Sequence, residues 1–140
     1  MITVHRQGFN KAQDKMIDEA VALGIKVRAS SAFASGIAAL NEPKLVTHLV
    51  QPEILKLDLQ FYRPWNPFTS ADAYAEKGTI YLNRNAFKRG LPELVGTLFH
   101  ERTHLEPMNY THGFYKSKER DASIPYQVGS LVLGIARRLA

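Results

Sequence analysis

The chain has 140 residues, of which 45% are hydrophobic, and its formal net charge is +5. This length and composition predict a single domain over residues 1–140 with a substantial core, and they exclude a disordered or multi-domain chain. Cysteine is absent, which excludes disulfides, thiol catalysis and cysteine metal sites. The basic residues are spread along the sequence, so we expect no nucleic-acid partner.

The start of the chain predicts a soluble protein without a leader. Residues 1–5 lack the basic and apolar regions of a signal peptide, and no apolar run is long enough to span a membrane. We therefore expect no membrane insertion, and either a cytoplasmic location or export without a leader. The oligomeric state does not follow from the sequence.

The first 40 residues predict a helix, a short strand and a segment of small residues. Asn10 is a good N-cap with Gln13 three residues later, and an apolar stripe then continues to Leu23. Gly24 is expected to end this helix. Residues 25–29 then predict a short strand, and residues 30–40 would favour a helix but for Gly36.

The middle of the chain predicts two strands separated by an aromatic loop. Residues 57–61 alternate apolar and polar side chains, which is the period of a half-buried strand, and residues 78–83 predict a second strand. Between them, residues 63–70 place Trp65 and Phe68 among prolines. We expect this loop to fold over the core, with a wall of a substrate cleft as the alternative.

The motif with the clearest chemistry is His100-Glu101-Arg102-Thr103-His104, which follows a helix start at Pro92 and Glu93. Residues four apart on a helix face the same way, so both imidazoles can bind one zinc ion with the glutamate beside them as a general base. A chain with five histidines and eight glutamates would contain roughly 0.01 such matches by chance. The apolar residues around the motif favour a buried helix over a surface helix with two solvated histidines.

A catalytic zinc ion usually has three protein ligands and a fourth position open to water. His112 is the first candidate for the third ligand, because Pro107 ends the helix and Asn109 can adopt the left-handed conformation that turns the chain back. Glu119 and Asp121 are the alternatives, because they could open a second helix that brings a carboxylate to the same ion.

This pattern resembles that of the metzincin endopeptidases, His-Glu-x-x-His-x-x-Gly-x-x-His. The residues from Asn109 to His112 are similar to its second half, with two extra residues in the turn and asparagine in place of glycine. Residues 123–126 resemble the Ser-x-Met-x-Tyr turn of astacin-like and serralysin-like members, although they are one residue shorter and lack the methionine. The resemblance implies Tyr126 as a fifth ligand or oxyanion donor. A second zincin branch, with a glutamate on a following helix, is similar through Glu119.

The resemblance implies an α+β zincin-like fold, with a mixed or antiparallel sheet packed on helices that include the motif helix. A final helix is expected over residues 124–139. In zincins the strand above the zinc cleft often lies at the sheet edge and binds an extended peptide by strand addition. We therefore expect the strand at residues 78–83 to lie at an edge.

The implied function is a zinc metallopeptidase that acts on a peptide or protein substrate. Glu101 would take a proton from the attacking water, while Tyr126 or Tyr110 would donate a hydrogen bond to the oxyanion. The alternatives are a zinc amidase for cell-wall or other non-protein amides, and a non-catalytic binding module stabilised by zinc. His5 and His48 lie outside the motif and are expected to be ordinary histidines.

Overall fold

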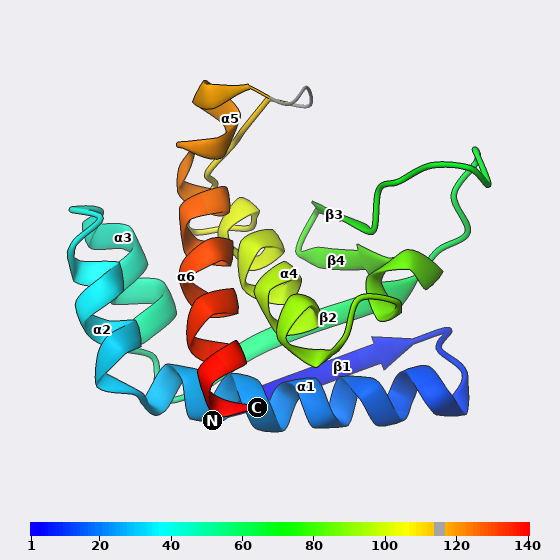
Figure 1. Cartoon of the computed structure of the whole chain (residues 1–140), viewed down its shortest axis with the longest axis horizontal. Coiled ribbons are helices and arrows are strands. Elements are labelled where there is room, and N and C mark those ends of the chain that lie inside the picture. The colour runs from blue at the N-terminus through cyan, green and yellow to red at the C-terminus, as the bar shows by residue number, and fades with distance from the viewer. Residues whose placement is uncertain (114–116) are drawn as a thin grey trace.

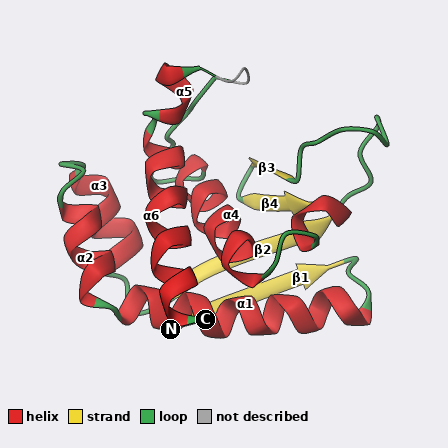
Figure 2. Cartoon of the chain, in the orientation of Figure 1, coloured by secondary structure: helices red, strands yellow, loops and turns green. Residues whose placement is uncertain are grey.

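The computed structural model describes residues 1–113 and 117–140, and it shows the predicted α+β fold, with helices packed on a four-stranded sheet (Figures 1 and 2). The strands are β1 (Ile2–Gln7), β2 (Leu55–Phe61), β3 (Ala73–Glu76) and β4 (Thr79–Leu82). The helices are α1 (Lys11–Ala29), α2 (Ser31–Ala38), α3 (Pro43–Leu45), α4 (Leu91–His104), α5 (Lys118–Asp121) and α6 (Ile124–Leu139). A π-helical turn spans Val46–Val50 and a 3-10 helix spans Arg84–Phe87.

The sheet is mixed and has the strand order β1-β2-β4-β3. β1, β2 and β4 are parallel, whereas β3 is antiparallel to β4. The prediction that the strand at residues 78–83 lies at an edge is wrong, because β4 lies between β2 and β3, and the edge strands are β1 and β3. The cause is a tight hairpin in which Lys77 and Gly78 both have positive φ, 49° and 84°, as a type I′ turn requires.

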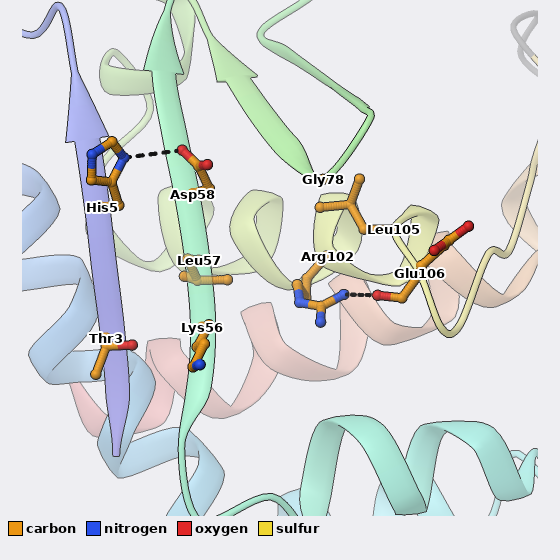
Figure 3. Close-up of a pocket in the computed structure, with 9 residues that line it drawn as sticks. All are labelled: Thr3, His5, Lys56, Leu57, Asp58, Gly78, Arg102, Leu105 and Glu106. Atoms are coloured by element: carbon orange, nitrogen blue, oxygen red, sulfur yellow. Dashed lines mark hydrogen bonds and ion pairs between the residues drawn. The ribbon is translucent and has the colours of Figure 1, made fainter.

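One face of the sheet forms the core and the other is open. Alternate residues of β2 (Leu55, Leu57 and Leu59) are buried, and Ile80 and Leu82 of β4 continue the same layer. Helices α1, α4 and α6 pack against one another over this face. On the opposite face the side chains of β1 and β2 are exposed, and in Figure 3 the strands lie in front with the helices behind them.

Helix α1 begins as predicted but extends further than expected. Asn10 and Gln13 form the reciprocal capping box, with hydrogen bonds of 2.8 and 3.0 Å. The strand predicted for residues 25–29 is wrong, because α1 continues to Ala29. Gly24 does not end the helix. A Cβ there would lie 3.1 Å from Ile2 Cδ1, so the glycine allows α1 to pack closely on the sheet.

The small-residue segment forms α2 despite Gly36, and its glycine also serves packing. A Cβ at Gly36 would lie 2.5 Å from Leu131 Cδ1, so a larger residue would push α2 away from α6. The side chain of Ser30 caps α2 by accepting a hydrogen bond from the Phe33 backbone at 3.2 Å. Ser30 is also the C-cap of α1, so a single residue separates α1 from α2.

The aromatic loop does not cover the core, so that expectation is wrong. Trp65 is 99% exposed and Phe68 is 92% exposed. The connection between β2 and β3 rises away from the rest of the molecule (Figure 1). Among the described residues, no helix combines the length and the apolar character needed to cross a membrane.

Candidate metal centre

Helix α4 carries the motif in the way the sequence predicts. Leu94, Val95, Leu98 and Phe99 are buried in the core, and the apolar side of the helix fixes its rotation. His100 and His104 then lie on a common face with their Nε2 atoms 3.4 Å apart. The helix ends at His104.

The chain turns back after α4 and brings His112 to the other two histidines. Asn109 has the left-handed conformation expected of it, with a φ of 55°. Met108 is buried in the core. The Tyr110 amide donates to the Thr103 carbonyl at 3.0 Å, and this hydrogen bond holds the segment after the turn against the end of α4. His112 Nε2 lies 3.1 Å from His100 Nε2 as a result.

The three histidines form a group that could hold a metal ion. One ligand nitrogen from each of His100, His104 and His112 lies within 4.8 Å of the other two. Two zinc–nitrogen bonds of about 2.05 Å at a tetrahedral angle place their nitrogens about 3.3 Å apart. The separations of 3.1 and 3.4 Å on either side of His100 Nε2 fit that spacing.

Backbone carbonyls fix the tautomers of two of the three imidazoles. His104 Nδ1 lies 2.7 Å from the Tyr110 carbonyl, and His112 Nδ1 lies 2.7 Å from the Gly113 carbonyl. A carbonyl only accepts, so Nδ1 of His104 and Nδ1 of His112 each carry the proton, and each Nε2 presents a lone pair. The backbone of Pro125 also contacts His100 and favours its protonated form.

The Nε2 atoms of His104 and His112 therefore each present a lone pair toward His100 Nε2, which lies 3.4 Å from the first and 3.1 Å from the second. Such an arrangement is stabilised by a cation at its centre. Burial, followed by the neighbouring His104 and His112, lowers the pKa of His100 to about 3. Burial also lowers the pKa of His104. These two imidazoles are therefore neutral at pH 7, which is the state that binds metal.

Helix α6 packs closely against α4 beside the histidines, and the two helices cross at Gly96 and Gly129. A Cβ at Gly96 would lie 3.2 Å from the Gly129 carbonyl, and a Cβ at Gly129 would lie 3.3 Å from His100 Cβ. The two backbones approach closely only because both residues lack side chains. This crossing brings the Pro125 carbonyl and the ring of Tyr126 to His100.

The close contact between α4 and α6 can be tested by protein stability, with a second glycine of α6 as the control. We expect Gly96→Ala to lower the free energy of unfolding by about 1–3 kcal/mol, because the added methyl meets a backbone carbonyl that cannot move aside. Gly134→Ala, also in a helix, meets only Arg138 Nη1 at 3.9 Å. It should stabilise the protein by about 0.5–1 kcal/mol through helix propensity. Urea unfolding measures both, and equal stability of the two variants would contradict the tight crossing.

Tyr126, the predicted fifth ligand or oxyanion donor, packs against two of the three histidines. Its ring centroid is 4.6 Å from that of His100 and 4.8 Å from that of His112. Residues 123–126 do not form a separate turn beneath the site. Ser123 is instead the N-cap of α6, and Tyr126 belongs to the first turn of that helix.

Glu101 is buried next to the histidines, and its carboxylate is isolated from strong partners. Its Oε1 atom lies 4.0 Å from His100 Nε2, which is too long for a direct hydrogen bond. Burial, with a smaller contribution from Asp72, raises the pKa of Glu101 to about 7. A carboxyl group with this pKa can both accept and return a proton near neutral pH.

The competing ligands lie apart from this group. Glu119 and Asp121 are exposed on the short helix α5, and neither belongs to the histidine group. Asp121 instead lies 3.6 Å from Arg120. The hydroxyl of Tyr110 donates to Glu42 at 2.8 Å, so it serves to anchor the turn, while its carbonyl orients His104.

A separate cavity of about 360 Å³ lies on the open side of the sheet (Figure 3). His5 and Asp58 form an exposed pair there, 3.4 Å apart. Arg102 reaches this cavity from α4, and it donates to the Glu106 carbonyl at 3.2 Å. Residues two apart on a helix do not face each other, so Arg102 and the metal-binding histidines serve different surfaces. His5 is not part of the histidine group.

Several residues that shape the site were not predicted from the sequence. Glu42 and Lys44 hold the turn that carries His112, and the Lys44 ammonium donates to the Met108 carbonyl at 3.0 Å. Gly96 and Gly129 could have been found, since glycine inside an apolar helix often marks a close contact. Asp72 gave no local signal, because it reaches Glu101 only through the fold.

No known protein family, curated protein or solved structure matches this chain. Its function is therefore inferred from the geometry of the histidine group and its surroundings.

Proposed function

We propose that this protein is a zinc-dependent metallopeptidase. The observation that carries the proposal is the convergence of three Nε2 atoms, from His100, His104 and His112, beside the buried carboxyl of Glu101. Three neutral imidazoles are a common ligand set of catalytic zinc. Among the described residues no fourth histidine or acid joins the group, which favours an open catalytic position over a closed structural site.

A zinc ion bound there would polarise the scissile carbonyl and lower the pKa of a water molecule to about 7. Glu101 would accept the proton of that water and later return it to the leaving nitrogen. Its carboxylate lies 4.0 Å from His100 Nε2, so it would lie within reach of a water held at the centre of the histidine group. Tyr126 would donate a hydrogen bond to the oxyanion, because the hydroxyl of Tyr110 is engaged by Glu42.

The position of β3 supports a peptide as the substrate. β3 is one of the two edge strands and contacts α4, so an extended chain added to its outer edge would run beside the helix that carries the histidines. The backbone of β3 would provide sequence-independent hydrogen bonds. An amidase for cell-wall amides would use the same histidines and Glu101 on a shorter substrate.

Metal removal tests the proposal directly. We expect a chelator to abolish cleavage of a broad peptide library, and about one equivalent of zinc per chain to restore it, because the attacking water is weakly acidic without the ion. Cell-wall fragments form the parallel arm that tests the amidase. Full activity after complete chelation would contradict a zinc hydrolase, and turnover of neither substrate by the zinc-loaded protein would favour a structural metal.

A further inference from the structure

We propose that the β2–β3 loop is a docking site for the surface of an anionic phospholipid bilayer. The loop, defined here as residues 62–72, presents the only tryptophan of the chain at its tip. Trp65 and Phe68 are 99% and 92% exposed, although such rings usually bury a large area. Two aromatic side chains that are three residues apart on one loop and almost fully exposed indicate an interaction surface.

The loop is held in shape by its own hydrogen bonds, so the exposure follows from its fold. The Phe68 amide donates to Asn66 Oδ1 at 3.0 Å, and the Thr69 amide donates to the Asn66 carbonyl at 3.2 Å. These bonds form a compact turn over residues 66–69, which contains Pro67. Its aromatic side chains project outward from the turn.

Two buried or half-buried asparagines fix the base of the loop. Asn83 Nδ2 donates to the Tyr62 hydroxyl at 3.0 Å and to the Ala71 carbonyl at 2.8 Å. Asn85 Nδ2 donates to the Thr69 carbonyl at 3.0 Å. The tip is thus presented on a supported base, and little conformational entropy is lost when it binds.

Charge around the tip selects an anionic surface. Residues 62–72 and 83–90 contain four basic residues and one acid, Asp72, which pairs with Arg89 at 2.7 Å. Within the described part of the chain the other three basic residues form no ion pair. Arg63 and Arg84 line a cavity of about 640 Å³ beside the tip, together with Pro64 and Pro67. Arg84 also donates to the Pro67 carbonyl at 3.2 Å.

The combination suits the interface of a bilayer. Tryptophan prefers the headgroup region, where its ring meets acyl chains and its N–H meets polar groups, and each basic residue near an anionic surface adds to binding. Trp65 and Phe68 would enter the interface while Arg63 and Arg84 pair with headgroup phosphates. This docking is peripheral, and it does not depend on the zinc chemistry proposed above.

The single tryptophan allows a direct test. We expect its emission to shift to shorter wavelength on addition of vesicles of phosphatidylglycerol and phosphatidylcholine, and to remain unchanged with phosphatidylcholine alone. Co-sedimentation should detect the same binding, and it should weaken at high salt. We expect Arg63→Gln with Arg84→Gln to weaken binding about 30-fold, since each basic residue contributes about a factor of 5.

Matched variants separate the loop from the rest of the surface. Trp65→Ala with Phe68→Ala should lose co-sedimentation, whereas Ile54→Ser, which replaces an apolar residue that is 45% exposed elsewhere, should bind as wild type does. Lys15→Gln with Lys26→Gln, both exposed on α1, should weaken binding far less than the arginine pair. No emission shift with anionic vesicles, full binding by the double aromatic variant, or a shift with an oligonucleotide but not with vesicles would overturn the proposal.

Discussion

Replacing His100 and His104 together by alanine should abolish stoichiometric zinc binding. Each imidazole would supply one of three protein ligands, and one ligand alone cannot hold the ion against the buffer. We expect the purified wild-type protein to contain about one zinc ion per chain, and the affinity of the double variant to fall by at least about 100-fold. Elemental analysis and competition with a chromogenic chelator measure both quantities.

Two control variants make this test specific. His48→Ala removes a histidine outside the group and should keep full zinc content. Glu119→Gln removes the carboxylate that a glutamate-ligated site would need, and it should also keep the metal, because Glu119 is exposed on α5. Full zinc content in the double histidine variant would contradict the site, and zinc loss in Glu119→Gln would reassign the third ligand.

Glu101→Gln should keep the zinc ion and the fold but lose hydrolysis. Glutamine has nearly the same size but cannot accept the proton of the attacking water, and proton transfer of this kind contributes typically 10²–10⁴-fold to the rate. The raised pKa of Glu101 shows that its surroundings favour the neutral carboxyl group, so the uncharged amide should fit without strain. The measurement is kcat/KM on a cleaved peptide at equal zinc occupancy.

Stability provides the second readout for Glu101→Gln. The variant should unfold at the same or slightly higher urea concentration than wild type, because it removes a buried group whose charged form is unfavourable. Activity equal to that of wild type would mean that another group activates the water. Loss of zinc together with activity would instead place Glu101 among the ligands.

The parts of the structure that were predictable are those with a strong local period. The alternation in residues 57–61 predicted β2, and the i,i+4 spacing of His100 and His104 predicted the shared face of α4. Strand β1 carried the same kind of signal, with Ile2 and Val4 alternating with polar residues, and it was missed. The alternation of apolar and polar residues in residues 2–5 was therefore sufficient to predict β1 as well.

The errors arose where packing decided the outcome. Gly24 and Gly36 predicted breaks, yet both lie within helices, at positions where neighbouring side chains occupy the space that a Cβ would need. The exposure of Trp65 was also unpredictable, since a large apolar residue is buried far more often than it is exposed. A single sequence does not contain the positions of the atoms that decide these cases.

The hydrogen bonds that orient His104 and His112 have a consequence for how this site tolerates change. Both acceptors are main-chain carbonyls, of Tyr110 and Gly113, so substitution of a side chain there leaves the acceptor in place. A deletion or insertion between His104 and His112 would shift both carbonyls at once. The length of the segment between His104 and His112 is therefore more tightly constrained than its residue types. Relatives with the same site could differ widely in the residues of this turn while keeping its length.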